Sequence, residues 1–115
     1  MKEGAARVAR LAGPFALAAL AACGPAGSGA SVERLYEQQC ASCHGSDGRG
    51  AAARRGLEPK LDLSRSILVA NGARGLLFER IAFGYNTMPG FAHKLPQGDL
   101  ERLADYVTRF AKPAE

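Results

Sequence analysis

The sequence predicts an all-α fold of one small domain with three to five short helices. Apolar residues recur at helical spacing in the stretches 32–41 and 75–83 and again after Pro96, and no segment is rich in strand-forming residues. A chain of 115 residues has room for one such domain. The first part of the chain has a different character, so we assign the domain to residues 32–115.

The first 22 residues have the pattern of a secretory signal peptide of the lipoprotein type. Three basic residues precede an apolar stretch at 11–22 that is too short to span a bilayer as a mature helix. The run Leu-Ala-Ala-Cys at 20–23 resembles the bacterial lipobox, in which the cysteine becomes the first mature residue and carries acyl chains. Lipidation of Cys23 would also explain the third, odd cysteine of an exported chain. Ordinary signal cleavage nearby, within the Ala-rich run, is the alternative.

Processing at Cys23 changes what the charge of the chain implies. The whole chain has a net charge of +4, but without residues 1–22 it keeps 12 basic and 10 acidic residues, a net charge of +2. The basic balance of the precursor is therefore no evidence for nucleic-acid binding. The residues at 24–30 are Gly-Pro-Ala-Gly-Ser-Gly-Ala, which predicts a flexible linker, so residues 23–31 would form a lipidated cysteine and linker.

The most informative motif is a Cys-x-x-Cys-His run at 40–44, at the end of the first predicted helix, for which Ser31 is a favourable N-cap. This pattern is typical of c-type haem attachment. Residues three apart share one face of a helical turn, so Cys40 and Cys43 can form thioethers with the two vinyl groups of a porphyrin. His44 is then placed to bind the iron through an imidazole nitrogen.

Other interpretations of this region are weaker. A structural zinc site needs four ligands, and only Cys23 and His93 remain to complete it. A thioredoxin-like redox pair stands beside a βαβ pattern, which this sequence lacks. A plain disulfide would leave His44 without a role. The Gly-rich stretch at 45–50 is a poor phosphate-binding loop, because it lacks a preceding strand and the Lys-Ser/Thr ending.

Two further residues are candidates for completing a haem site. A histidine ligand usually donates its other ring N–H to a carbonyl or carboxylate, and we predict that the Pro59 carbonyl accepts this bond from His44. Met88 is the one methionine left after removal of the signal, and it lies in an irregular loop at 85–91. Methionine and histidine together raise the potential of a haem, so we expect Met88 to be the distal ligand. His93 is the rival, and it would give a bis-histidine site of lower potential.

The last predicted helix begins at Pro96, where a missing N–H costs little, and ends at Pro113. Its apolar residues follow helical spacing from 100 to 111, with acidic residues early and basic residues late, as the helix dipole prefers. This apolar stripe must be buried, and the first helix is the expected partner.

With these elements in place, the chain resembles a class I c-type cytochrome of the short bacterial mono-haem kind over residues 32–112. The motifs that carry the resemblance are Cys40-Ala41-Ser42-Cys43-His44-Gly45, Pro59-Lys60-Leu61, Thr87-Met88-Pro89-Gly90-Phe91 and Leu103-Ala104-Asp105-Tyr106-Val107. The resemblance implies an all-α fold in which the first and last helices cross. It also implies one covalent haem c held between His44 and Met88, attached on the periplasmic side.

The function expected from this reading is electron transfer rather than enzymatic catalysis. An iron with both axial positions filled has no open position for a substrate, so it can only cycle between two oxidation states. We therefore expect a carrier tethered by lipid to the periplasmic side of a bacterial membrane, or an electron-transfer subunit of a respiratory complex. Its partners would be redox proteins, with no nucleic acid and no small-molecule substrate. The alternative is a haem enzyme or gas sensor whose distal position is open or displaceable.

Overall fold

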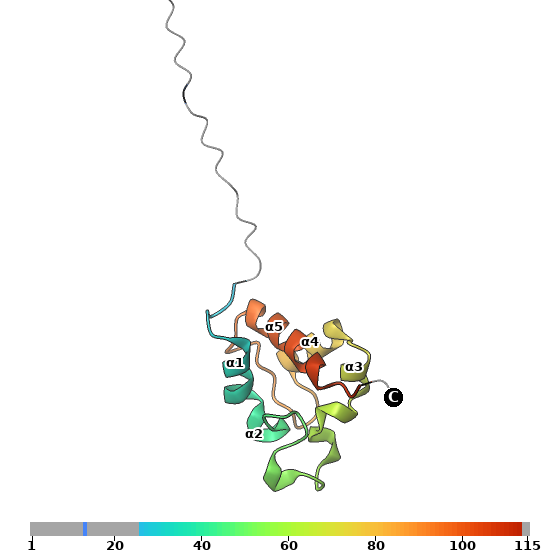
Figure 1. Ribbon diagram of the computed structural model, residues 1–115. Coiled ribbons are helices and arrows are strands. Elements are labelled where there is room, and N and C mark those ends of the chain that lie inside the picture. Colours follow the sequence, from blue (N-terminus) through green and yellow to red (C-terminus); the bar gives the residue numbers. More distant parts are fainter. Residues whose placement is uncertain (1–12, 14–25, 114–115) are drawn as a thin grey trace, which may run out of the picture.

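The computed structural model describes residue 13 and residues 26–113, so the predicted signal peptide and Cys23 lie outside the described residues. Within this part the fold is helical, with two isolated bridges and no strand, which confirms the predicted all-α class (Figure 1). The α-helices are α1 (Val32–Gln39), α2 (Ala41–His44), α3 (Ile67–Ala70), α4 (Arg74–Phe83) and α5 (Gln97–Val107). Short 3₁₀ turns are η1 (Ala52–Arg54), η2 (Pro59–Leu61), η3 (Leu63–Arg65) and η4 (Thr108–Phe110).

Helix α1 begins where the sequence predicts, because Ser31 caps it. The side-chain oxygen of Ser31 accepts a hydrogen bond from the Arg34 N–H at 3.2 Å, which satisfies one of the free donors of the first turn. The helix ends at Gln39, two residues earlier than expected. Cys40 leaves helical geometry with φ of −122°, although its N–H still bonds to the Tyr36 carbonyl at 2.8 Å. The attachment motif therefore starts at a break and continues into a separate turn, α2.

The first and last helices pack against each other around Tyr36, as the resemblance implies. Tyr36 and Leu103 have no exposed surface at all. The Tyr36 ring lies 5.2 Å from both the Tyr106 and the Phe110 rings, in the tilted arrangement that aromatic pairs favour. Figure 1 shows α1 beside α5, with α4 on the other side of α5. The buried core draws on these three helices, on α3 and on two positions outside the helices: Leu35, Tyr36, Cys40, Val69, Leu77, Ile81, Ala82, Phe91, Leu100, Leu103, Ala104 and Val107.

Helix α4 confirms the predicted helix over 75–83 with one more residue at its start. Arg74 forms an ion pair with Asp105, which ties the beginning of α4 to the later part of α5. Gly84 ends the helix with φ of +78°, a conformation that glycine adopts without strain. The chain then turns into the loop that carries Met88.

The segment ahead of α1 differs from the flexible linker that the sequence predicted. Residues 26–30, here called the strap, are hydrogen-bonded to the beginning of α5 at three points. The Ala26 carbonyl accepts from Gly98 at 3.0 Å, the Ser28 N–H donates to the Asp99 carboxylate at 3.2 Å, and Arg102 donates to the Ala30 carbonyl at 2.9 Å. The glycine and serine content predicts a flexible backbone here. The strap is nevertheless fixed, because the buried carboxylate of Asp99 on α5 accepts a hydrogen bond from it.

The other end of α5 contacts the loop that follows the attachment motif. The ring of Phe110 lies directly over Gly48, where an added Cβ would come within 2.4 Å of the ring. Gly48 also has φ of +74°, so both its backbone and the space above it require glycine. Helices α1 and α5 therefore run between two ends of the domain. The strap marks one end, and the attachment motif with its loop marks the other.

None of the helices in the described ranges has the length and apolarity needed to cross a bilayer.

Replacement of Gly48 by alanine should destabilise the protein by about 2–5 kcal/mol, from left-handed strain plus a clash with Phe110. Gly72→Ala is the matched control, because Gly72 has φ of +58° with nothing within 4 Å, and it should cost only about 1–2 kcal/mol. Denaturant unfolding of the two variants measures both. An equal loss of unfolding free energy in the two variants would show that the clash with Phe110 adds nothing to the cost.

Candidate haem site

The attachment motif forms one tight helical turn. The N–H groups of Cys43 and His44 both bond to the Cys40 carbonyl, at 3.2 Å and 2.9 Å. Cys40 is buried and Cys43 is half-buried, and both thiols are free. The motif thus joins the core through its first cysteine and reaches toward the surface through its second.

The environment of Cys40 argues against a thioredoxin-like role. Burial, together with a smaller contribution from the neighbouring Cys43, raises the pKa of the Cys40 thiol to about 11. A redox-active pair needs the opposite, a depressed pKa that supplies thiolate near neutral pH. Before haem is attached, the Cys40 side chain is therefore a neutral thiol at pH 7, which behaves as a small apolar group of the core.

The imidazole of His44 is oriented by a backbone carbonyl, and the carbonyl is not the one predicted. His44 Nδ1 lies 2.8 Å from the Leu61 carbonyl oxygen. The Pro59 carbonyl, proposed from the sequence, instead accepts from the Asp62 N–H at 3.2 Å. The reason is local: Pro59 begins the 3₁₀ turn η2, which directs its carbonyl along the turn, whereas Leu61 ends that turn and its carbonyl is left for the histidine.

This bond decides which nitrogen of His44 is available. A carbonyl oxygen can only accept, so in the neutral imidazole the proton sits on Nδ1 and Nε2 keeps its lone pair. A neutral imidazole with a free Nε2 is the form that binds a metal ion. The donor set of the motif therefore fits haem iron.

The loop after the motif is folded back onto it. The Gly50 N–H donates to the His44 carbonyl at 2.6 Å, and the Ala51 N–H donates to the Cys43 carbonyl at 2.9 Å. From the other side, the buried hydroxyl of Tyr36 donates to the Gly45 carbonyl at 2.7 Å. Burial raises the pKa of Tyr36 far above its ordinary value, so the hydroxyl keeps its proton and stays a donor. The backbone around His44 is held by the core and by its own loop.

Met88 lies in a loop that is closed by paired backbone hydrogen bonds. Tyr85 and Met88 exchange N–H···O bonds at 3.1 Å and 2.9 Å. Two glycines let the loop pass close to the end of α4: a Cβ on Gly84 would lie 2.5 Å from the Met88 carbonyl oxygen, and one on Gly90 would lie 2.6 Å from the Phe83 carbonyl carbon. The irregular loop predicted here is therefore a fixed one.

The far side of this loop is attached to α4 as well. The Phe91 N–H donates to the Ile81 carbonyl at 2.9 Å, and the Ala92 N–H donates to the Ala82 carbonyl at 3.0 Å. Met88 is half-buried and packs against the core, whereas His93 is exposed. Of the two candidate distal ligands, Met88 is the one that the core holds in place.

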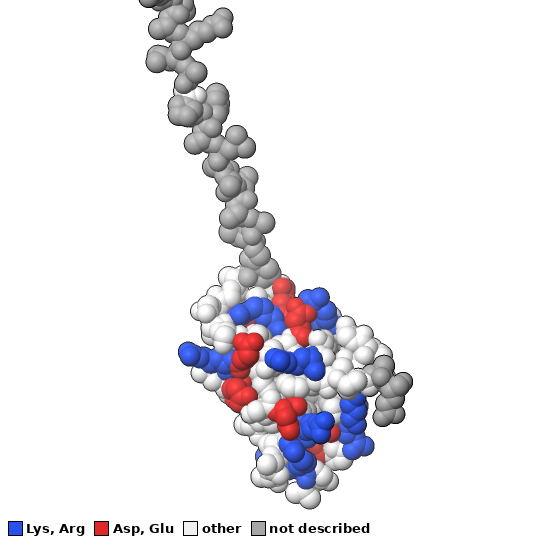
Figure 2. Space-filling view, in the orientation of Figure 1, with Lys and Arg blue, Asp and Glu red and all other residues white. Residues whose placement is uncertain are grey.

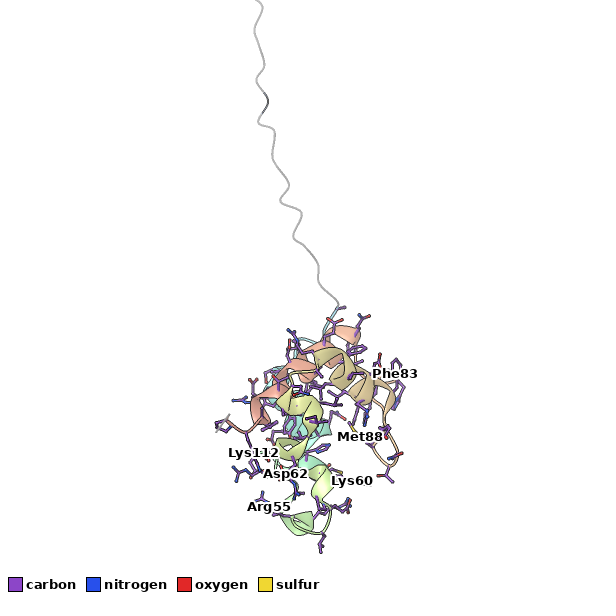
Figure 3. The ribbon with its side chains drawn as sticks, turned by 90° about the vertical axis from the view of Figure 1, so that its right-hand side faces the viewer. Arg55, Lys60, Asp62, Phe83, Met88 and Lys112 are labelled. Carbon is purple, nitrogen blue, oxygen red and sulfur yellow. The ribbon has the colours of Figure 1, made fainter. Side chains whose placement is uncertain are left out.

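Figure 3 shows the loop of Met88 and the segment of Lys60 and Asp62 as two arms that extend from the helical body toward the same end of the domain. Exposed apolar side chains lie on or beside these arms, among them Ile67, Phe83 and Tyr85. Exposed apolar surface of this kind suits a wide apolar cofactor. By contrast, no three His, Cys, Asp or Glu side chains within residues 26–113 gather to hold a lone metal ion.

The described residues form a helical domain whose first and last helices pack together. It carries a Cys-x-x-Cys-His turn at one end and a methionine on a separate loop. These features define a class I c-type cytochrome. The sequence matches the protein family described as cytochrome c oxidase, cbb3-type, subunit III, over residues 27–107, and the chain belongs to this family. Membership implies one covalently bound haem c and a role in electron transfer between redox partners.

Individual proteins agree with this assignment. The chain is 31% identical to cytochrome c6 of Bumilleriopsis filiformis over 77 residues, which is 65% of this chain and 83% of that protein. It is 30% identical to cytochrome c6 of Porphyra purpurea over 77 residues, covering 65% of this chain and 64% of that protein. Among solved structures, KustC0563 c-type cytochrome is similar with a TM-score of 0.60 and 27% identity, over 72% of this chain and all of that one.

Two residues that shape the site were not anticipated from the sequence. Leu61 contributes only a backbone carbonyl, and a carbonyl leaves no signature in side-chain patterns. Tyr36 is one of the apolar residues at helical spacing in the stretch 32–41, which predicts a core position and no more. The signal for its role at the site is its spacing of four residues from Cys40. That spacing places the tyrosine on the same helix face as the cysteine, one turn earlier.

Replacement of Tyr36 by phenylalanine should cost about 1 kcal/mol of stability, because the Gly45 carbonyl loses a buried donor while the ring packing remains. Tyr106→Phe is the matched control, since its hydroxyl makes no hydrogen bond to any described residue; it should be close to neutral. Thermal unfolding followed in the haem absorption compares the two. A Tyr36→Phe variant as stable as Tyr106→Phe would contradict the assigned role of the hydroxyl.

Proposed function

We propose that the chain is a mono-haem electron carrier in which Cys40 and Cys43 form the thioethers and His44 and Met88 are the axial ligands. The observation that carries this proposal is the hydrogen bond from His44 Nδ1 to the Leu61 carbonyl, because it leaves Nε2 free for iron. When bound, the haem supplies one-electron redox chemistry. The residues of this chain orient the ligands and exclude water.

Met88 supports the choice of a carrier over an enzyme or sensor. Its loop is closed by the Tyr85 pairing and tied to α4 through Phe91, so it is fixed before any ligand binds. A fixed thioether at the sixth position leaves no place for a substrate or gas. The soft sulfur ligand also favours the reduced iron and raises the potential.

We also propose that the carrier is tethered to a membrane, on the periplasmic side, through acyl chains on Cys23. The Leu-Ala-Ala-Cys run after an apolar stretch supports the tether. The family description, which is that of an oxidase subunit, supports a role as an electron-transfer subunit of a respiratory complex. Partners would be redox proteins that dock transiently.

The surface charges fit transient docking rather than nucleic-acid binding. Figure 2 shows acidic and basic side chains interleaved on the face that carries α1 and α5. Near the motif loop, Arg55 pairs with Asp47 at 2.9 Å and Arg54 lies 3.6 Å from Glu58, all of them about half exposed. Exposed pairs like these contribute little to stability. Because each pair joins opposite charges, the surface near them does not develop a strong electrostatic potential of one sign.

Replacement of Met88 by alanine should open the sixth position of the haem iron. The weak red-edge absorption band of Met–Fe(III) should disappear, and the reduced protein should bind carbon monoxide. The reduction potential should decrease, because loss of the sulfur ligand removes a preference for reduced iron; axial ligands change haem potentials over about 0.8 V. His93→Ala is the control and should change none of these. A wild-type protein that lacks the band and binds carbon monoxide would favour the enzyme or sensor instead.

Replacement of Cys23 by serine tests the tether separately. Intact mass should show haem and acyl chains on the wild type. A Cys23→Ser chain exported by an ordinary cleavable signal peptide in place of residues 1–22 should carry haem alone and should move to the soluble fraction. Several acyl chains anchor firmly, since each buried CH₂ contributes about 0.8 kcal/mol. The haem spectrum should be unchanged. A wild-type mass without acyl chains would reject lipidation.

A further inference from the structure

The strap is held by a carboxylate that has no exposed surface. Asp99 lies in the first turn of α5 and is 0% exposed. Both of its oxygens accept from the Ser28 N–H at 3.2 Å, and it forms an ion pair with Arg102. Arg102 in turn donates to the Ala30 carbonyl at 2.9 Å. A buried charge that loses a partner is costly, so release of the strap is opposed by more than the loss of a surface contact.

Gly27 shows how closely the strap lies on this carboxylate. A Cβ at position 27 would come within 2.9 Å of Asp99 Oδ1, so a larger residue here would push the strap and the carboxylate apart. By contrast, Gly29 has open space around it. The Ala26 carbonyl adds a bond to Gly98 at 3.0 Å. The strap is therefore held at Ala26, Ser28 and Ala30, and these contacts fix the point at which the chain leaves the domain.

That exit point is at the end of the domain opposite the attachment motif. The strap contacts the first turn of α5 and precedes α1. The motif follows α1, and the ring of Phe110, in η4 directly after α5, covers the motif's loop. At about 1.5 Å per residue, α1 and α5 place about 12–16 Å between the two ends. Figure 1 shows the strap next to the beginning of α5 and α2 at the far end of α1.

The length of chain between Cys23 and the first fixed residue then decides which orientations are reachable. With the strap bound, the three residues from 23 to 26 span at most about 11 Å. An inverted domain, with its motif end on the membrane, would hold the strap about 12–16 Å above the surface, which this length does not reach. With the strap released, the first fixed residue is at the start of α1. The nine residues to position 32 could then span about 30 Å, enough for the domain to turn over.

We propose that the strap is an orienting mount, which turns the strap end toward the membrane and presents the attachment-motif end to the aqueous compartment. The docking surface is therefore the motif end, and the partner is a redox protein that approaches from the aqueous side. This inference rests on the lipid tether proposed above. It adds that the tether does not leave the domain free to rotate.

Single cysteines at the two ends test the orientation in the lipidated holoprotein. Leu57→Cys marks the motif end, where Leu57 is 80% exposed, and Gln97→Cys marks the strap end, where α5 begins. Each is bound to preformed phosphatidylcholine and phosphatidylglycerol vesicles and treated with a large polyethylene-glycol maleimide. The rates of maleimide modification are compared with those of the same cysteine in the Cys23→Ser chain exported by an ordinary cleavable signal peptide, which stays in solution.

We expect vesicles to lower the rate of maleimide modification of Cys at position 97 several-fold relative to the soluble chain, and to leave the rate at position 57 unchanged. Adding Gly27→Leu, which lifts the strap off Asp99, should make the two positions respond alike. Gly29→Asn is the matched control, because it adds a side chain in open space and asparagine tolerates positive φ; it should keep the wild-type contrast. The visible spectrum and thermal midpoint confirm that each variant remains folded.

The outcomes separate this inference from the tether itself. A chain without acyl chains by intact mass would reject the tether and the orientation together. A lipidated chain whose two positions are slowed equally, or whose contrast survives Gly27→Leu, would reject the mount and leave the tether standing.

Discussion

The buried side chain of Tyr36 is the contact on which the rest of the structure depends. Its ring fills the junction between α1 and α5, in contact with Tyr106 and Phe110. Its hydroxyl reaches past the break at Cys40 and holds the Gly45 carbonyl. One residue therefore joins the packing of the terminal helices to the turn that presents His44. A change in how the helices cross would move the ligand.

The site is assembled from three pieces that meet only in the folded chain. The attachment turn follows α1, the acceptor for His44 comes from η2, and Met88 comes from the loop after α4. Each piece is fixed by backbone hydrogen bonds to its neighbours rather than by contacts among the functional side chains. Such an arrangement suits the proposed electron transfer, because the two proposed ligands, His44 and Met88, are held independently and would move little when the charge on the iron changes.

Side-chain patterns were enough to predict the helices, the attachment motif and the loop of Met88. Apolar periodicity, the Ser31 cap and Gly84 are local signals, and the structure confirms the elements that they predict. The parts that could not be predicted depend on backbone geometry or on distant partners. The carbonyl that meets His44 is set by where a 3₁₀ turn ends, and a Gly-rich segment became a strap because a buried carboxylate 71 residues away receives it.

The choice of a carbonyl as the partner of His44 has one more consequence. An acidic side chain in this position could draw the ring proton toward itself and pull the imidazole toward its anionic form. The Leu61 oxygen is uncharged and has no capacity to take up a proton, so the Nδ1 proton stays on the ring throughout. The orientation of the His44 ring is then set by a partner that carries no charge of its own, so it does not depend on whether a neighbouring side chain is protonated.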